Sequence, residues 1–173
     1  MNETLKTLLE RRSVRSYENK PVSEEILKQI VDVGLYAPSA MGRQDAAVIV
    51  VTNPTVREAL SKANAEAMGV TSDPFYGAPV VLVVIAKKSP TAHENGSAMI
   101  MNMLIAATSF GLASCWIHRA KEELETDFGR HLLQDSGFDP DEYVGIGNVI
   151  VGYGKGALPL AKPRLNGRAV YLK

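Results

Sequence analysis

The sequence predicts a three-layer α/β/α sandwich, with helices on both faces of a central sheet. Segments with the apolar spacing of helices alternate with short, β-branched runs along the chain. One of these runs, Val80–Ile85, is apolar at every position, which is typical of a strand covered on both faces. The chain has 173 residues, enough for one substantial core and too few for two, so residues 1–173 are expected to form a single domain.

The first half of the chain shows both kinds of element. Apolar residues recur at helical spacing over residues 5–9 and 26–35, and Ser23 is a suitable N-cap for the second of these helices. The run at 46–52 is rich in valine and predicts a buried strand. A third helix is expected to begin directly after Asn53.

The second half continues the alternation. Residues 94–110 are apolar nearly all round, which predicts a helix buried in the core or between subunits. The other expected elements are strands at 80–85, 112–117 and 144–153 and a polar-faced helix at 121–133.

The charge balance and the hydropathy pattern exclude several classes of partner. Lysine plus arginine and aspartate plus glutamate number 19 each, so the chain has no excess positive field for nucleic acid or an anionic membrane. No apolar run approaches the roughly 20 residues of a membrane helix, and the N-terminus lacks the pattern of a secretion signal. These features predict a soluble, cytoplasmic protein that acts on small molecules.

Cysteine and histidine are too sparse for a metal centre or a disulfide. Cys115 is the only cysteine and lies in an apolar run, so we expect a small buried hydrophobe in a reducing compartment. His93, His118 and His131 are scattered and lack the paired spacing of metal ligands. No metal is expected.

The densest polar signal follows the first helix. Three guanidiniums and two hydroxyls lie within residues 11–16, and arginine forks match phosphate oxygens in bidentate geometry. A solvated basic turn is the alternative interpretation. A second basic element, with Lys162 and Arg164, lies in a proline-rich tail that is either a solvated arm or a second contributor to the same anion site.

The tail itself is expected to be an extended arm over residues 158–173. It finishes in a strand-like segment, 169–172, that has no hairpin partner in the sequence. Pairing with another subunit would explain such an end.

A third polar element is the loop at 37–44, between a predicted helix and strand. Its small residues allow a flat ring to approach the backbone, and Gln44 can both donate and accept hydrogen bonds. An ordinary helix-to-strand connection has a similar composition.

In this order, the segments resemble the nitroreductase family of FMN enzymes. That family has an Arg-x-Ser-x-Arg-like opening, a Pro-Ser-x-x-Asn-x-Gln loop, a Gly-Leu-x-x-x-Trp strand, found here at 111–116, and a basic C-terminal clamp. The resemblance spans nearly the whole chain. It implies an α+β fold, the nitroreductase-like α/β/α sandwich with a mixed central sheet.

The resemblance also implies roles for individual residues. The FMN phosphate would be held by Arg11, Arg12 and Ser13 with Lys162 and Arg164, and Arg15 would reach the pyrimidine end of the ring. The isoalloxazine would be lined by Pro38, Ser39, Ala40 and Gln44, with Asn64, Ile117 and His118 also in contact. His118 is interpreted as a structural contact or, alternatively, a proton donor.

Three residues are assigned to the substrate pocket: Met41, Phe75 and Tyr76. Phe75 and Tyr76 lie in a loop that either covers this pocket or plugs an apolar edge. No protein side chain is assigned as catalytic, because the flavin carries the chemistry.

Two positions depart from the family pattern. Gly42 replaces the usual asparagine, and Asp45-Ala46 replaces the usual Pro-Trp. A flavin contact is therefore lost, or it is made by the backbone or by Arg43.

The expected function is an FMN-dependent oxidoreductase. A homodimer would pass hydride from NADH or NADPH to a small electron-poor acceptor, such as a nitroaromatic or a quinone, in a ping-pong cycle. The alternatives are a flavin-binding or phosphate-binding module without turnover, a relative that performs flavin breakdown or dehalogenation, and a scaffold whose arginines form intersubunit salt bridges.

Overall fold

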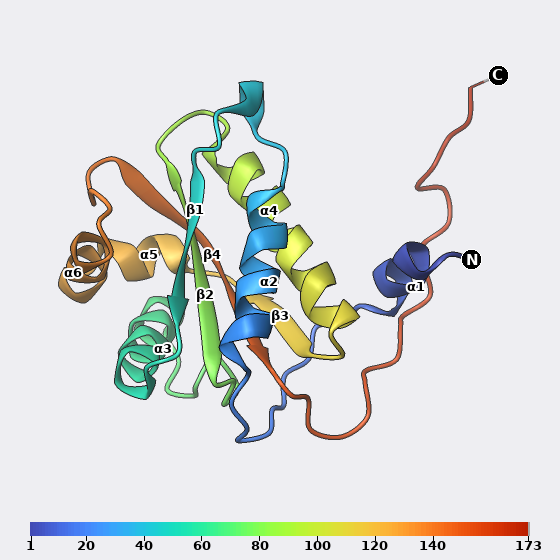
Figure 1. Cartoon of the computed structure of the whole chain (residues 1–173), viewed down its shortest axis with the longest axis horizontal. Coiled ribbons are helices and arrows are strands. Elements are labelled where there is room, and N and C mark those ends of the chain that lie inside the picture. The colour runs from blue at the N-terminus through green and yellow to red at the C-terminus, as the bar shows by residue number, and fades with distance from the viewer. Residues whose placement is uncertain (173) are drawn as a thin grey trace.

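The predicted three layers are confirmed in a computed structural model, which describes residues 1–172 (Figure 1). Its elements are α1 (Glu3–Glu10), α2 (Glu24–Leu35), the 3-10 turn η1 (Ala40–Gly42), β1 (Ala46–Val51), α3 (Pro54–Met68), β2 (Val80–Lys87), α4 (Ala92–Ser109), β3 (Ala113–Ile117), α5 (Ala120–Glu125), α6 (Asp127–Asp135) and β4 (Tyr143–Gly152).

The helix predicted at 121–133 is in fact two helices, α5 and α6. Thr126 separates them, because its backbone is extended (φ −71°, ψ 160°). Its hydroxyl accepts a hydrogen bond from the Gly129 amide at 3.1 Å and so caps the start of α6. Neither glycine nor proline occupies the break, so the sequence contains no strong stop signal there.

The sheet has the strand order β1-β2-β4-β3, and each neighbouring pair is antiparallel. The expected mixed character is limited to an isolated parallel bridge, in which Ser13 pairs with Ser114 of β3. This bridge attaches the segment after α1 to the outer edge of the sheet.

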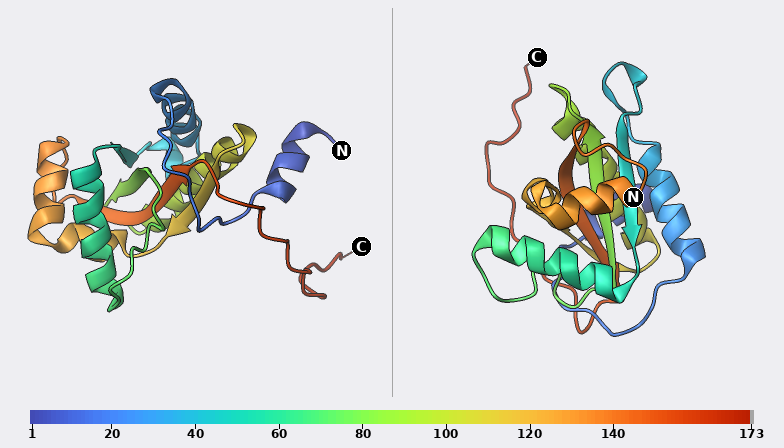
Figure 2. Two further views of the ribbon diagram at one scale, coloured as in Figure 1. Left: turned by 90° about the horizontal axis from the view of Figure 1, so that it is seen from below. Right: turned by 90° about the vertical axis from the view of Figure 1, so that its left-hand side faces the viewer.

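Strand β2 divides the core into two halves because its side chains alternate between the two faces. Leu82 and Val84 pack with α2 and α4, whereas Val83 and Ile85 pack with α3, α5 and α6. All four side chains are fully buried. The views in Figure 2 show the corresponding layers, with a helical layer on each side of the sheet.

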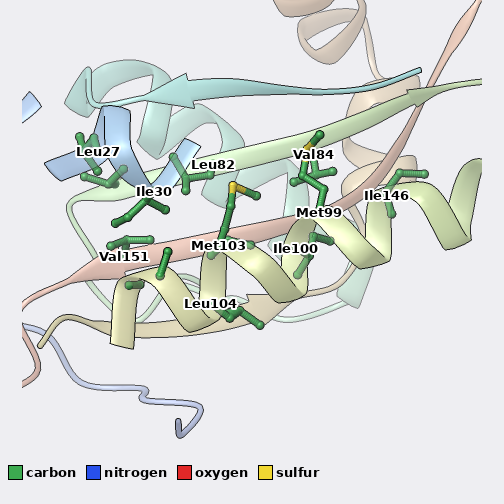
Figure 3. Packing of buried hydrophobic residues seen from close by; sticks show 14 of the residues in the cluster. Leu27, Ile30, Leu82, Val84, Met99, Ile100, Met103, Leu104, Ile146 and Val151 are labelled. Atoms are coloured by element: carbon green, nitrogen blue, oxygen red, sulfur yellow. The ribbon is translucent and has the colours of Figure 1, made fainter. Parts of the chain in front are cut away.

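Helix α4 is the main support of the first half of the core. Met99, Ile100 and Met103 face the sheet, as Figure 3 shows. At Gly34 of α2 a Cβ atom would lie 2.7 Å from Met103 Cγ, so the absent side chain allows α2 and α4 to pack closely. The helix predicted at 94–110 is thus confirmed, and it is buried in the core of one chain.

Helix α1 and the C-terminal arm lie together at one side of the molecule (Figures 1 and 2). No residue of α1 is buried, and the arm carries Leu160, Leu165 and Leu172 at 94%, 78% and 95% exposure. Residues 169–172 do not form the strand that their composition suggested, and Lys173 of the predicted arm lies outside the described residues. Within residues 1–172 no helix has both the length and the apolar character needed to cross a bilayer.

Candidate functional site

The basic segment after α1 is anchored to β3. The Val14 amide donates to the Ser114 carbonyl at 3.0 Å, next to the bridge at Ser13. Burial raises the pKa of the Cys115 thiol, but the positive charge of Arg15, a hydrogen bond with Ser13 and the charge of Arg11 act in the opposite direction. Cys115 itself is buried as expected.

Arg12 has a different environment from its neighbours. Its guanidinium donates to the carbonyl oxygens of Leu9 at 2.7 Å, Arg11 at 2.8 Å and Pro159 at 3.1 Å. It therefore connects the end of α1 with the start of the arm. In this arrangement Nε and Nη1 of Arg12 donate to three backbone carbonyls.

The arm, which carries the two predicted phosphate ligands Lys162 and Arg164, lies on the same side of the molecule as α1 (Figure 1). Lys162 and Arg164 are exposed. Within residues 1–172, neither these two side chains nor Arg11 and Arg15 form an ion pair with a carboxylate. Cations without anionic partners are available to an anionic ligand.

A pocket of about 430 Å³ brings together four of the predicted site residues. Its walls are formed by Arg15, Met68, Pro74, Tyr76, Trp116, Ile117, His118 and Arg119. The guanidinium carbon of Arg15 lies 6.0 Å from the centroid of the Tyr76 ring. We call this cavity the Arg15 pocket.

Phe75 does not line the Arg15 pocket, although it precedes Tyr76. Its side chain is fully buried in the core beneath the loop, where the guanidinium carbon of Arg57 lies 5.4 Å from its ring centroid. This burial is consistent with the apolar plug, one of the two roles considered for Phe75. Tyr76 is 42% exposed and faces the pocket.

Asp73 holds the loop that carries Tyr76. Its carboxylate accepts hydrogen bonds from Arg57 at 2.5 Å, Ser61 at 2.6 Å and the amides of Phe75 at 2.9 Å and Gly77 at 2.8 Å. Burial would raise the pKa of Asp73, but these four donors outweigh it and lower the pKa. The bonds fix Tyr76 in a left-handed conformation (φ 52°) that is unfavourable for a bulky residue.

A buried polar cluster lies behind the opposite wall of the pocket. Glu123 of α5, Asn64 of α3 and Asn148 of β4 are all fully buried. Asn148 Nδ2 lies 2.9 Å from both carboxylate oxygens of Glu123, and Asn64 donates to the same carboxylate and to the His118 carbonyl at 2.7 Å. Asn64 therefore faces inward and supports the turn at His118 from behind, while His118 itself is exposed at the pocket.

Burial raises the pKa of Glu123 to about 7, although hydrogen bonds from Asn148 and Asn64 favour its charged form. Asn64 Oδ1 and Asn148 Oδ1 have no hydrogen-bond partner in the described part of the chain. These two acceptors lie in the same cluster as the carboxyl group, which is consistent with a proton being held there.

Two glycines of β4 allow the pocket wall to pack closely on the sheet. The ladder between β2 and β4 shifts register at Ile146, because Val84 pairs with Gly147 and Ile85 with Gly145. A Cβ atom at Gly145 would lie 2.2 Å from the Ala120 carbonyl oxygen, and one at Gly147 would lie 2.2 Å from Trp116 Nε1. These close approaches fix the position of the turn after β3 and of the Trp116 indole ring, both of which line the pocket.

Pro38, Ser39 and Gln44, three of the other residues predicted to face the flavin, line a separate cavity. A pocket of about 670 Å³ is lined by Leu35, Tyr36, Ala37, Pro38, Ser39, Gly42 and Gln44. None of these residues lines the Arg15 pocket. A single chain therefore does not bring the two groups of predicted cofactor ligands into one site.

The loop around this second pocket has unusual backbone geometry. Met41 (φ 55°), Gly42 (φ 64°) and Gln44 (φ 51°) are all left-handed, which costs a non-glycine residue on the order of 1 kcal/mol or more. Met41 is 79% exposed. The Ser39 hydroxyl accepts from the Gln44 amide at 2.9 Å, and the Asn95 side chain on α4 accepts from the Ala40 amide at 2.9 Å.

Several residues that shape the site were not predicted from the sequence. Trp116 lines the pocket, and its outward direction follows from alternation with the buried Cys115 and Ile117. Asn95 and Glu123 are buried polar residues in helices, a signal that requires knowing which helix faces are covered. Among residues 1–172 no group of three or more His, Cys, Asp and Glu residues is arranged to hold a metal ion.

Comparison with known proteins agrees with this geometry. The sequence model of the Nitroreductase family matches residues 8–74 and 66–153. A protein of Archaeoglobus fulgidus named as an NADH dehydrogenase/NAD(P)H nitroreductase is 31% identical over 159 residues, which cover 90% of this chain and 87% of the relative.

Solved structures give the same result. The crystal structure of a nitroreductase with bound FMN from Bacteroides fragilis superposes with a TM-score of 0.90 at 31% identity, with all of both chains covered. A nitroreductase with bound FMN from Desulfitobacterium hafniense gives a TM-score of 0.88 at 26% identity, again over the whole of both chains. The match spans most of the sequence and includes the basic opening segment, the loop at 37–44 and both walls of the Arg15 pocket, so this chain belongs to the nitroreductase family.

Proposed function

We propose that this chain is an FMN-dependent oxidoreductase that transfers hydride from NADH or NADPH to a small electron-poor acceptor, such as a nitroaromatic or a quinone, by a ping-pong mechanism. Its family membership and its relatives support the class of NAD(P)H-dependent flavin oxidoreductases. The observation that carries the proposal is the Arg15 pocket, whose arginine has no carboxylate partner within residues 1–172. The same is true of Arg11, Lys162 and Arg164.

The phosphate of FMN fits the segment that follows α1. Arg11 and Ser13 belong to the segment that is bridged to β3, and the arm that carries Lys162 and Arg164 lies on the same side of the molecule as α1. We assign these four residues to the phosphate and Arg12 to the placement of the arm, through its bond to the Pro159 carbonyl. An arm held mainly at its start can move its charged groups onto a bound dianion.

FMN supplies the hydride acceptor and donor when it is bound. Arg15 contributes a fixed positive charge in the pocket, which would stabilise negative charge that develops on the ring during reduction. Tyr76 and His118 lie at the pocket mouth, where they limit the size of the molecule that can enter. One pocket that admits the nicotinamide and then the acceptor would produce ping-pong kinetics.

The complete site is proposed to form in a homodimer. The loop at 38–44 lines a different cavity from Arg15, so a second copy of the chain must bring its own loop to the Arg15 pocket if both groups contact one flavin. The exposed leucines of α1 and of the arm support this assignment, because association would remove them from water.

The cytoplasm is the proposed location. The single cysteine is buried and reduced in this fold, which is consistent with a reducing compartment.

The purified chain provides the test. We expect a yellow protein that releases a ligand with the mass of FMN and oxidises NADH or NADPH when a quinone or nitroaromatic is added. Arg11→Ala and Lys162→Ala are expected to weaken FMN retention strongly. Arg130→Ala is the control, because Arg130 pairs with Asp141 at 3.0 Å outside both pockets.

The outcomes separate the competing functions. Equal retention in all three variants would contradict the phosphate assignment. Protein that retains FMN but turns over no acceptor would instead be a flavin-binding module.

A further inference from the structure

The loop that carries Ser39, Ala40 and Gln44 is held at both ends by one side chain of α4. Asn95 Oδ1 accepts a hydrogen bond from the Ala40 amide at 2.9 Å, and Asn95 Nδ2 donates to Asp45 Oδ1 at 2.7 Å. Residues 41–44, including all three left-handed residues, lie between these two contacts. A single carboxamide therefore bridges the two ends of the turn.

Asn95 is well placed for this task because it is itself fixed. It is only 4% exposed, belongs to the second turn of α4, and its Nδ2 also lies 3.5 Å from the Thr91 hydroxyl. It forms part of a cavity of about 140 Å³ beneath the loop, together with Pro38, Ser39 and Gln44. A buried amide with its donor and its acceptor both engaged specifies one orientation of the loop.

The second contact of this bridge, from Asn95 to Asp45, is made at a position where this chain departs from the family pattern. Asp45 occupies a position where the family usually has proline, and its carbonyl also accepts the Lys87 amide at the end of β2 at 3.0 Å. Proline would have restricted the backbone by its ring, whereas aspartate provides an acceptor for Asn95. Arg43, the other residue that could replace the lost flavin contact, is exposed and forms no ion pair within residues 1–172.

The backbone at Gln44 is held on both sides of the residue. Its backbone amide donates a hydrogen bond to the Ser39 hydroxyl at 2.9 Å. The residue that follows it, Asp45, is held by Asn95. The carboxamide of Gln44 is exposed and forms no hydrogen bond to another described residue, so both its donor and its acceptor are available to a ligand.

We infer that Asn95 and Asp45 form a positioning pair that holds Ser39, Ala40 and Gln44 in the shape required for contact with the flavin ring. The inference rests on the flavin-facing role proposed for this loop. Neither residue touches the reacting atoms. Their action is exerted through the backbone of the loop, in place of the stiff Pro-Trp segment that this chain lacks.

The pair can be tested by exchanging its donor and its acceptor. Asn95→Asp keeps an acceptor for the Ala40 amide but places a second carboxylate next to that of Asp45, and the two charges repel. Asp45→Asn keeps an acceptor for Asn95. The double variant, Asn95→Asp with Asp45→Asn, restores one donor and one acceptor with their places exchanged. Asn102→Asp is the matched control, because Asn102 lies on the same helix and donates to the Val33 carbonyl at 3.1 Å, away from the loop.

Each full-length variant is freed of flavin and titrated with FMN by equilibrium dialysis. The visible absorption spectrum and the midpoint potential of the bound flavin are then recorded, together with the thermal unfolding of the flavin-free protein. We expect Asn95→Asp to raise the dissociation constant about tenfold or more and to shift the spectrum or the potential. Asp45→Asn and Asn102→Asp should stay within about threefold of the parent chain, and the double variant should recover most of the loss.

The results distinguish this inference from the proposed function. A parent chain that binds no FMN would overturn both. A parent chain that binds FMN, with an Asn95→Asp variant of equal affinity and spectrum, would overturn only the positioning pair. The pair would also be overturned if Asn95→Asp bound FMN more weakly with an unchanged spectrum and the double variant recovered no affinity. A general loss of stability would produce that combination of results. If Asn95→Asp does not fold, Asp45→Ala removes the same contact from the partly exposed side, and unchanged FMN affinity in that variant would contradict the inference.

Discussion

The guanidinium of Arg12 donates to the carbonyl oxygen of Pro159 at 3.1 Å, across 147 residues of sequence. This bond joins the segment after α1 to the C-terminal arm, and the same guanidinium also holds two carbonyls at the end of α1. The two basic segments that the sequence set at opposite ends of the chain are thereby kept together.

Arg12→Ala should release the arm. Removal of a charged donor from a partly exposed site costs on the order of 1 kcal/mol, which is enough to raise the population of a detached arm several-fold. Limited proteolysis should then cut residues 155–168 faster than in the parent chain, while the circular dichroism spectrum is unchanged. Arg130→Ala should leave the cutting rate unaltered, and an equal rate in Arg12→Ala would show that the bond does not hold the arm.

Glu123 should make the stability depend on pH in the weakly acidic range. Its pKa rises from an ordinary 4.5 to about 7 in the folded chain, so the folded state binds more protons than the unfolded state between these values. The free energy of unfolding should therefore fall as the pH rises from 4.5 to about 7, by at most about 3 kcal/mol, and then level off. Urea unfolding at a series of pH values measures this change.

Glu123→Gln should remove that dependence, since glutamine stays neutral throughout. Glu125→Gln is the control, because Glu125 is exposed and lies 4.0 Å from Lys121. A slope that persists in Glu123→Gln would assign the titration to another group.

Asp73→Asn should loosen the loop that carries Tyr76. The variant loses the ion pair with Arg57 and weakens the bonds from two backbone amides, which we expect to cost about 1–2 kcal/mol. Because the pKa of Asp73 is lowered, its contribution is present above about pH 3.8, its ordinary value, and is lost as the pH falls through the folded-state value. Chemical denaturation at neutral pH gives the difference. Asp141→Asn should cost less, since the Asp141 side chain is 81% exposed.

Gly145→Ala should destabilise the wall of the Arg15 pocket. The added Cβ would meet the Ala120 carbonyl oxygen at 2.2 Å, and this neighbour is backbone rather than the end of a flexible side chain, so the chain itself must shift. We expect a loss of about 2 kcal/mol or more in urea unfolding. Gly154→Ala, just beyond β4, is a milder change, because the nearest neighbour of the added atom is the Ala113 Cβ atom at 3.0 Å. A loss as large as that of Gly145→Ala would show that the backbone contact at Ala120 is not the cause.

The sheet and its two helical layers could be predicted because local patterns determine them. Val80–Lys87 alternates between two cores with no polar residue until its end, so its sequence required cover on both faces. Residues 169–172 show the limit of this reasoning. Their composition favours a strand, but a strand requires a hydrogen-bonded neighbour, and these residues pair with no strand within residues 1–172.

The placement of single side chains within the site could not be predicted in the same way. Arg11 and Arg12 are adjacent and identical, yet only Arg12 binds the carbonyl of Pro159. Phe75 and Tyr76 are adjacent aromatics, yet one is in the core and the other lines a pocket. These differences depend on contacts between segments far apart in the sequence.

Trp116 is the only tryptophan in the sequence, and it lies in the wall of the Arg15 pocket. Its fluorescence emission is therefore a single-site signal, uncontaminated by indoles elsewhere in the fold. Any aromatic molecule that stacks in this cavity will quench it, so occupancy can be followed in real time and without a label.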